Sequence, residues 1–183
     1  MVFYRRKLPD WQPEGMALFV TWRLSGSLPA EVQEKILQNE PEKAFLITDR
    51  FLDKASKGPL WLNDPAVATM VIEAIEFGES RLKLYQLVAY VLMANHVHAL
   101  WIPHAPLSRI THAIKSFTAL EANQILGRRG KPFWQHESFD HWVRSETELR
   151  RIVRYIEYNP VRAGLVERVE IWPWSSATGR MTE

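Results

Sequence analysis

The strongest constraint on the fold is a pair of apolar, strand-length runs, residues 84–93 and 96–103, separated only by Ala94 and Asn95. Two such runs across so short a break predict a β-hairpin. Pro103 ends the second run, since proline cannot continue the hydrogen-bonded ladder of an inner strand. The other predicted elements can be ordered around this hairpin.

Before the hairpin, the periodicity of apolar residues predicts one strand and then helical segments. Residues 16–25 alternate and are rich in strand-forming side chains, whereas residues 30–38 have helical spacing. Residues 39–63 are less regular and predict a short helix followed by a loop. Asp64-Pro65 is a typical helix start, and the helix it opens should run to about residue 80.

After the hairpin, two amphipathic helices flank a short strand. Ser108 is expected to cap a long helix that continues to residue 126, and a strand is expected near residues 139–144. Ser145 and Glu148 form a capping box for a last helix, which Asn159-Pro160 should end or disturb. The order strand, helix, strand, strand, helix, strand predicts an α+β fold with a ferredoxin-like β-α-β-β-α-β core, an antiparallel sheet and extra helices. With 183 residues, one domain over 1–183 is expected, with a short aromatic tail.

Composition narrows the chemistry that the chain can carry. At 46% hydrophobic and 24% charged residues, the chain can bury a sizeable core, which excludes disorder as its dominant state. The sequence has no cysteine, which excludes a disulfide framework, a cysteine-ligated zinc site and an iron–sulfur cluster. Any metal must therefore bind to histidine, carboxylate, amide or water ligands.

The N-terminal residues and the hydropathy pattern predict a cytoplasmic protein. The first residues are basic, but no apolar stretch of the kind found in signal peptides follows them. No run of about 18 apolar residues occurs, so no membrane span is expected.

Charge is divided unevenly along a chain whose net charge is only +2. Residues 31–80 contain ten acidic and five basic groups, whereas residues 108–162 contain ten basic and six acidic groups. The N-terminal arm adds Arg5, Arg6 and Lys7. Basic groups interleaved with aromatic residues favour a polyanionic partner, most simply nucleic acid. A solvated helix face is the alternative interpretation of the same charges.

His96-Val97-His98 is a candidate metal site in the second strand of the hairpin. Residues i and i+2 of a strand point to the same face, so both imidazoles can approach one ion while Val97 points into the core. The alternative is one buried, hydrogen-bonded histidine and one exposed histidine. The apolar surroundings favour the metal site, because unpartnered polar rings would be costly there.

Tyr155 and Asn159 are four residues apart and therefore share a face of the last helix. Tyr155 supplies a hydroxyl, and Asn159 supplies a carbonyl oxygen that could be a third metal ligand. The alternative is that Tyr155 packs on the sheet and Asn159 caps the helix before Pro160. The same segment carries the basic residues that a phosphate-binding site requires, namely Arg150, Arg151, Arg154 and Arg162.

Several motifs occur together and in a fixed order between residues 4 and 176. They are Tyr4-Arg5-Arg6, MANHVHALWIP, IKSFT, KPFWQHESFDHWVRS, YIEYNPVRAGLV and WPWSS. In this combination the chain resembles the HUH single-tyrosine transposases, and among them the REP-associated tyrosine transposases. The predicted ferredoxin-like core is similar to the fold of that family.

The resemblance implies a role for individual residues. His96 and His98 fall on the histidine pair that holds a divalent cation, Mg²⁺ or Mn²⁺, and Tyr155 falls on the nucleophile. Asn159 falls where relatives place a polar third ligand. Tyr4, Arg5 and Arg6 match a basic arm that contacts the DNA element. Residues 31–63 appear longer than the pattern of the family and are assigned no role.

The implied activity is nicking and rejoining of single-stranded or hairpin DNA, as in REP-like palindromic elements, through a covalent 5′-phosphotyrosine. No small-molecule cofactor or membrane is expected, and the protein is expected to act as a monomer or homodimer. Lys115 is a further candidate phosphate contact, with a solvated helix face as its alternative. Two competing functions are a catalytically idle nucleic-acid-binding module of the same fold and a metal hydrolase without covalent catalysis. An intact set of His96, His98 and Tyr155 favours the nicking enzyme over the binding module, and the absence of further histidine or acidic ligands near the pair in the sequence counts against the hydrolase.

Overall fold

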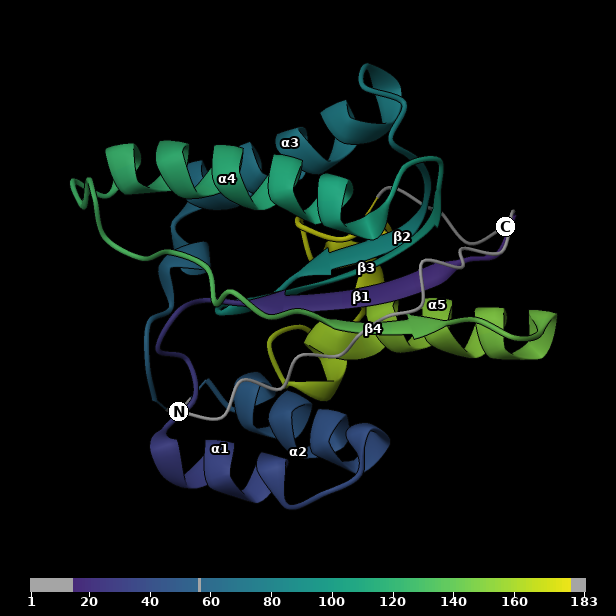
Figure 1. Ribbon diagram of the computed structural model, residues 1–183, viewed down its shortest axis with the longest axis horizontal. Helices are drawn as coiled ribbons and strands as arrows, with labels where there is room; N and C mark the ends of the chain where they lie inside the picture. The colour runs from purple at the N-terminus through teal and green to yellow at the C-terminus, as the bar shows by residue number, and fades with distance from the viewer. Residues whose placement is uncertain (1–14, 56, 179–183) are drawn as a thin grey trace.

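The computed structural model describes residues 15–55 and 57–178, which form a four-stranded antiparallel sheet covered by helices on both faces (Figure 1). The strand order across the sheet is β2-β3-β1-β4. The strands are β1 (Leu18–Arg23), β2 (Tyr85–Leu92), β3 (His96–Pro103) and β4 (Phe139–Trp142). This order and the predicted succession of elements confirm the α+β, ferredoxin-like arrangement.

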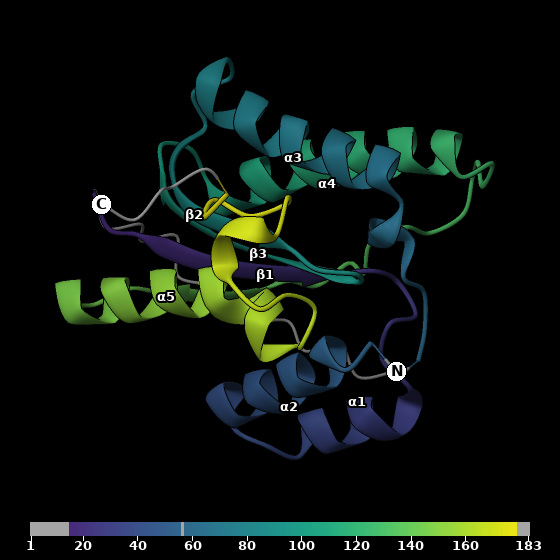
Figure 2. The same ribbon diagram turned by 180° about the vertical axis from the view of Figure 1, so that it is seen from behind.

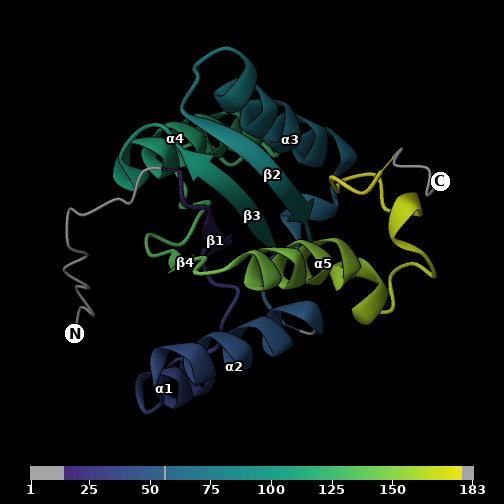
Figure 3. The same ribbon diagram turned by 90° about the vertical axis from the view of Figure 1, so that its right-hand side faces the viewer.

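The helices divide between the two faces of the sheet (Figures 1 and 2). One face carries α3 and α4, which pack side by side, and the other carries α5. A helical hairpin of α1 and α2 lies next to α5, on the side away from α3 and α4 (Figure 3). The helices are α1 (Ala30–Leu37), α2 (Pro41–Asp53), α3 (Pro65–Ser80), α4 (Leu107–Ile125) and α5 (Glu146–Arg162), with short 3-10 turns η1 (Trp61–Asn63) and η2 (Val169–Ile171).

The period of two in β1 and β3 separates two hydrophobic cores. Trp22, Val97 and Trp101 belong to the core under α3 and α4. Phe19 and Leu100 belong to the core under α5. Even-numbered residues of β3 therefore face α5, and this places His96 and His98 on that side of the sheet.

The predicted helix starts are confirmed for α3 and α5. Asp64 Oδ1 accepts hydrogen bonds from the backbone N–H groups of Ala66 and Val67, at 2.9 and 3.3 Å. Ser145 Oγ accepts from the backbone N–H of Glu148 at 3.1 Å. Each contact satisfies an N–H group that has no partner within the helix. These caps fix where both helices begin.

Three details of the predicted helices differ from the structure. The α4 helix begins at Leu107, with Pro106 rather than Ser108 at the N-cap, because proline presets the backbone for the turn that follows. Pro160 does not end α5, which continues to Arg162. Pro160 is buried, and the carbonyls of Asn159 and Pro160 still accept from the N–H groups of Ala163 and Leu165.

The third difference lies between residues 39 and 63, where only a short helix was predicted. The structure has a 13-residue helix there, α2, which is preceded by α1 and packs against it. Among the described residues, none of the helices combines the length and apolarity needed to cross a lipid bilayer.

Candidate functional site

The two histidines of β3 lie side by side on the face of the sheet that α5 covers. Both side chains are fully buried, and their Nε2 atoms are 3.1 Å apart. The i, i+2 spacing in a strand produces this pairing directly. The ring of Phe19 stacks against His98, with centroids 5.6 Å apart. The predicted approach of the two imidazoles is therefore present in the structure.

The other ring nitrogen of each histidine is held by a neighbour. Nδ1 of His96 lies 2.7 Å from Oδ1 of Asn95, whose amide nitrogen donates to the carbonyl of Leu52 at 3.1 Å. Since Oδ1 can only accept, Nδ1 of His96 carries the hydrogen and Nε2 keeps a free lone pair. Nδ1 of His98 lies 2.7 Å from the hydroxyl of Thr21, which faces it across the ladder between β1 and β3. Such partners orient metal-binding imidazoles.

Two carboxylates reach the histidine pair from α2. Asp49 Oδ1 lies 3.1 Å from Nε2 of His98, and Asp53 Oδ1 lies 3.8 Å from Nε2 of His96. Asp49 is 2% exposed, so its carboxylate is almost entirely removed from water. One ligand atom each from Asp49, His96 and His98 lies within 4.8 Å of the others. These three residues form a group that could hold a metal ion.

Tyr155 reaches the same place from α5. Its ring lies 5.6 Å from the ring of His98 between centroids, and its hydroxyl interacts with the carboxylate of Asp49. The guanidinium of Arg162 lies over the Tyr155 ring at 4.7 Å, with Nη2 3.5 Å from the hydroxyl. The predicted nucleophile, the histidine pair and one predicted arginine therefore converge.

Arg162 is shared between the tyrosine and the two acids of α2. Its Nη2 donates to Asp49 Oδ2 at 2.7 Å and to Asp53 Oδ2 at 2.6 Å. These charge-assisted bonds join the end of α5 to α2. Arg162 is partly exposed, so its guanidinium can be reached from solvent.

Charge and burial shift the pKa values of these groups in different directions. Burial raises the pKa of Asp49, but its close contact with His98 and the charges nearby reverse the effect and hold that pKa well below its usual range. Burial and the charge of Asp49 raise the pKa of Asp53, against the influence of Arg162. Burial, followed by the neighbouring His98, lowers the pKa of His96 well below its usual value. His96 is therefore neutral near pH 7, as a metal ligand must be.

Tyr155 keeps its proton more tightly than an exposed tyrosine. Burial raises its pKa above the ordinary value, and the charge and hydrogen bond of Asp49 add to the rise. Arg162 acts in the opposite direction, because its positive charge favours the phenolate. Additional positive charge beside the hydroxyl would thus make Tyr155 a better nucleophile.

Asn159 lies one turn after Tyr155 in α5 and is fully buried. Within the described part of the chain, neither Oδ1 nor Nδ2 of its side chain has a hydrogen-bond partner. A buried amide without partners is costly unless something else satisfies it. This is consistent with the predicted role of Asn159 as a ligand, which stays a prediction.

The residues present suit a divalent cation. Two imidazole nitrogens face one another with their outer nitrogens held, and a buried carboxylate oxygen, Asp49 Oδ1, has no hydrogen-bond partner in the described part of the chain. Nitrogen and oxygen donors of this kind bind Mn²⁺, Mg²⁺ and other divalent first-row ions.

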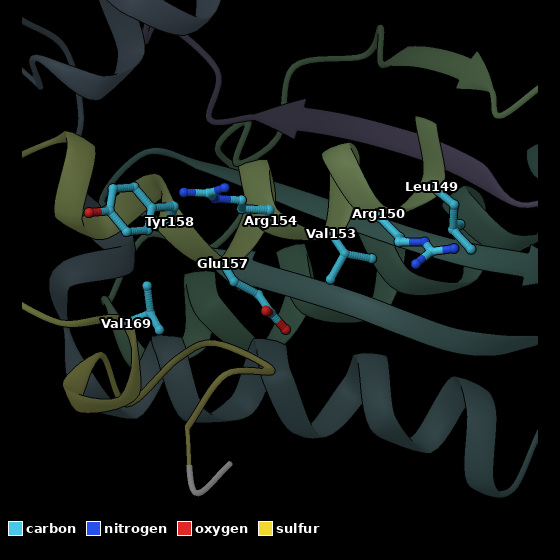
Figure 4. Close-up of a pocket in the computed structure, with 7 residues that line it drawn as sticks. All are labelled: Leu149, Arg150, Val153, Arg154, Glu157, Tyr158 and Val169. Carbon is cyan, nitrogen blue, oxygen red and sulfur yellow. The ribbon is translucent and has the colours of Figure 1, made fainter. Parts of the chain in front are cut away.

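Other predicted DNA contacts lie away from this centre. Lys115 is turned inward, and its ammonium donates to the carbonyls of Gln135 and His136 at 2.7 and 2.8 Å. Arg150 and Arg154 line an open groove of about 310 Å³ between α5 and η2 (Figure 4). Arg151 is exposed, and its Nη2 atom lies 3.6 Å from Oε1 of Glu148. Their roles in DNA binding stay predictions, and Tyr4, Arg5 and Arg6 lie outside the described residues.

Asp49 and Asp53 were not among the site residues predicted from the sequence. They are four residues apart, which is the spacing of neighbours on one helical face, and this spacing was the available signal. The irregular pattern of residues 39–63 concealed the helix that carries them. Nothing in the local sequence indicates that this helix packs beside β3.

Comparison with known proteins confirms the resemblance to REP-associated tyrosine transposases. A Haemophilus influenzae protein that carries this name is 32% identical over 103 residues, and the REP-associated tyrosine transposase of Escherichia coli is 31% identical over 96 residues. Each match covers 50% of this chain, and the chain spans 58% and 54% of the two relatives. No family model matches the chain.

A solved structure supports the fold. The REP-associated tyrosine transposase bound to a REP hairpin superposes with a TM-score of 0.59 over 96% of this chain and 82% of that chain. Sequence identity over this match is 22%. The chain therefore shares its overall fold with that transposase.

Proposed function

We propose that the protein is a metal-dependent DNA-nicking and strand-transfer enzyme of the REP-associated tyrosine transposase type. The observation that carries the proposal is the convergence of Tyr155 on the buried histidine pair, with the rings of Tyr155 and His98 5.6 Å apart. A tyrosine beside a histidine pair is the minimum required for covalent phosphodiester cleavage at a metal centre. The resemblance to transposases supports the same assignment.

In this mechanism, the hydroxyl oxygen of Tyr155 attacks a backbone phosphorus atom. The bond from phosphorus to the 3′ oxygen breaks, which leaves a 5′-phosphotyrosine and a free 3′-OH. Arg162, beside the tyrosine hydroxyl, is positioned to bind the phosphate oxygens. Because the phosphotyrosine conserves the bond energy, the 3′-OH of another DNA end can reverse the step and join the strands.

His96 and His98 would hold the divalent cation, with Asn159 as the predicted third ligand. When bound, such a cation supplies positive charge that polarises a phosphate oxygen. The chain contributes the rest of the catalytic geometry: Asn95 and Thr21 orient the imidazoles, and α5 delivers the tyrosine. Burial of both histidines keeps bulk water from their ring nitrogens.

The proposed substrate is single-stranded DNA or a DNA hairpin. The support is the structural match, because that transposase is bound to a REP hairpin. Arg150, Arg154 and Tyr158 all line the open groove, where they offer charge and an aromatic ring to a strand that passes α5 (Figure 4). Stacking of an unpaired base on such a ring is worth about 1–3 kcal/mol.

The test is formation of a covalent adduct with a labelled DNA hairpin. The full chain is incubated with the hairpin and its single-stranded flanks in Mn²⁺ or Mg²⁺, and adducts are separated on a denaturing gel. Tyr155→Phe should abolish the adduct, because the attacking oxygen is removed, while hairpin binding stays nearly unchanged. Tyr158→Phe is the matched control, since Tyr158 is half exposed on the same helix and phenylalanine keeps its ring, so removal of the hydroxyl alone should leave the adduct intact.

An adduct that persists in Tyr155→Phe would show that another residue is the nucleophile. Hairpin binding by the wild-type chain without any adduct would favour the idle binding module. Cleavage without a covalent intermediate would favour the metal hydrolase. The three candidate functions are thus separated by one gel and one binding measurement.

A further inference from the structure

The α1–α2 hairpin places a carboxylate at the metal centre, although the sequence resemblance assigned no role to residues 31–63. Asp49 is the buried member of this helical hairpin that faces the histidine pair, and its Oδ1 atom lies 3.1 Å from Nε2 of His98. Phe45, one turn earlier in α2, stacks on Phe139 of β4 with ring centroids 4.3 Å apart. The side of α2 that carries Phe45 and Asp49 is therefore packed against the face of the sheet that carries His96 and His98.

The two oxygens of Asp49 have different surroundings. Oδ2 accepts a hydrogen bond from Arg162 at 2.7 Å. Oδ1 is buried and, within the described residues, receives no aligned hydrogen bond, although it is close to His98. An ionised oxygen in that position is expensive unless a positive charge faces it. An oxygen of Asp49 and one nitrogen of each histidine all lie within 4.8 Å of one another, close enough to bind one ion.

The balance of charge at the site also favours a carboxylate ligand. A divalent cation held only by His96, His98 and Asn159 would have neutral protein ligands and would be buried close to the guanidinium of Arg162. Like charges at short range in a site shielded from water repel strongly. An anionic ligand removes one unit of this excess charge, and Asp49 is the carboxylate whose oxygen joins the histidine nitrogens.

We propose that Asp49 is a protein ligand of the divalent cation, so that the α1–α2 hairpin as well as α5 completes the metal centre. The inference rests on the proposed function only in that both require a cation on His96 and His98. The α1–α2 hairpin then has a role that no sequence motif indicates. Metal affinity should then depend on α2 being packed against the sheet.

The test is a calorimetric titration of Mn²⁺ into the chelator-treated full chain, with no DNA present. Replacing an outer-shell partner of a metal ligand costs about 10–100-fold in affinity, so removing the negative charge of a direct ligand in Asp49→Asn should weaken Mn²⁺ binding at least about tenfold. Asp53→Asn is the matched control, because Asp53 is on the same helix and shares Arg162, but its Oδ1 atom lies farther from the histidine pair, at 3.8 Å from Nε2 of His96, and does not join the three-residue group. Its effect should be much smaller.

Unchanged Mn²⁺ binding by Asp49→Asn would overturn the proposal. Equal losses in Asp49→Asn and Asp53→Asn would also overturn it, because they would indicate a general charge effect. Circular dichroism and thermal unfolding without metal establish that each variant is folded. The titration involves no reaction, so failure of the DNA adduct assay leaves this result interpretable.

A second variant keeps the test decisive if Asp49→Asn does not fold. The chain has no cysteine, so Asp49→Cys introduces a single thiol. A thiolate bound to Co²⁺ produces a near-ultraviolet charge-transfer band, which is expected for Asp49→Cys and not for the control Asp53→Cys. Absence of the band in a folded, Co²⁺-binding Asp49→Cys protein would contradict the assignment of Asp49 as a ligand.

Discussion

At the scale of single residues, the same side-chain chemistry serves different purposes according to burial. Arg162 and Lys115 were both predicted to contact DNA phosphate. Arg162 lies beside Tyr155 and is partly exposed, so it can receive a phosphate. Lys115 donates to two carbonyls and to Ser138 Oγ, so in this structure its ammonium fastens the loop before β4 to α4.

Lys115 should make stability depend on pH in the alkaline range. Burial lowers its pKa from 10.5 to about 8 in the folded protein, with Arg23 adding to the shift and Glu137 opposing it. Between these two values the unfolded chain binds more protons than the folded chain, so the contribution of Lys115 to stability rises with pH. Urea unfolding of wild type and Lys115→Met should therefore show a gap in unfolding free energy that widens from about pH 7 to about pH 10.

Each unit of pKa difference corresponds to about 1.4 kcal/mol, so the widening should be measurable. At pH values below the folded pKa, the difference in unfolding free energy still includes the hydrogen bonds to the carbonyls of Gln135 and His136, which lose their donor in the methionine variant. A gap that stays constant over this range would contradict the lowered pKa.

At the scale of elements, the helices differ in how firmly they are attached. The α3 helix buries five residues against the sheet and α4, whereas α1 buries none. Of the α2 side chains that the structure describes, Asp49 and Leu52 are buried. Few buried apolar contacts mean a low free energy of local opening. The hairpin that carries Asp49 is thus less firmly held than α3.

Hydrogen exchange should reveal this difference. Amides of residues 30–53 are expected to exchange faster than amides of residues 65–80, because the α1–α2 hairpin opens without unfolding of the core. The measurement is exchange followed by mass spectrometry of peptides from the metal-free protein. Equal protection of the two regions would contradict local opening.

Mn²⁺ should then slow exchange in residues 30–53 of the wild-type chain. A ligand that binds only the closed arrangement stabilises it by mass action. Asp49→Asn should lose this protection, whereas Asp53→Asn should retain most of it. Slowing of equal size in both variants would show that the metal stabilises the hairpin without Asp49.

At the scale of the whole molecule, the C-terminal tail closes one edge of the sheet. The backbone N–H of Leu92 donates to the carbonyl of Trp174 at 2.9 Å, and that of Ser176 donates to the carbonyl of Tyr90 at 2.9 Å. The indole of Trp172 donates to the carbonyl of Leu92. Exposed edge strands invite pairing with other chains, and this tail occupies the edge of β2.

Ending the chain after Ile171 should therefore destabilise the protein and promote association. The truncated chain leaves backbone groups of Tyr90 and Leu92 without their partners and uncovers an apolar strand edge. Thermal unfolding and light scattering measure the two effects. A chain that ends after Thr178 keeps every described tail contact and is the control. A truncated chain as stable and monodisperse as this control would contradict the role of the tail.

Some site residues could be predicted from the sequence because local periodicity places them, whereas others are placed only by contacts between distant segments. His96 and His98 were predictable because strand period alone puts them on one face, and Tyr155 and Asn159 because helix period does the same. Asp49 and Asp53 carry the same helical spacing, but their helix lies far from the histidines in sequence. Their meeting with β3 depends on packing of the α1–α2 hairpin.

The sequence by itself determined the order of the elements, the α+β class and the faces on which the paired histidines and the tyrosine lie. These follow from local periodicity and turn chemistry, which act within a few residues. Only the tertiary structure decided that Asp49 joins the histidines, that Arg162 turns toward Tyr155 and that Lys115 turns inward. Each of these contacts joins segments separated along the chain, so burial and charge pairing in the folded molecule select them rather than any local pattern.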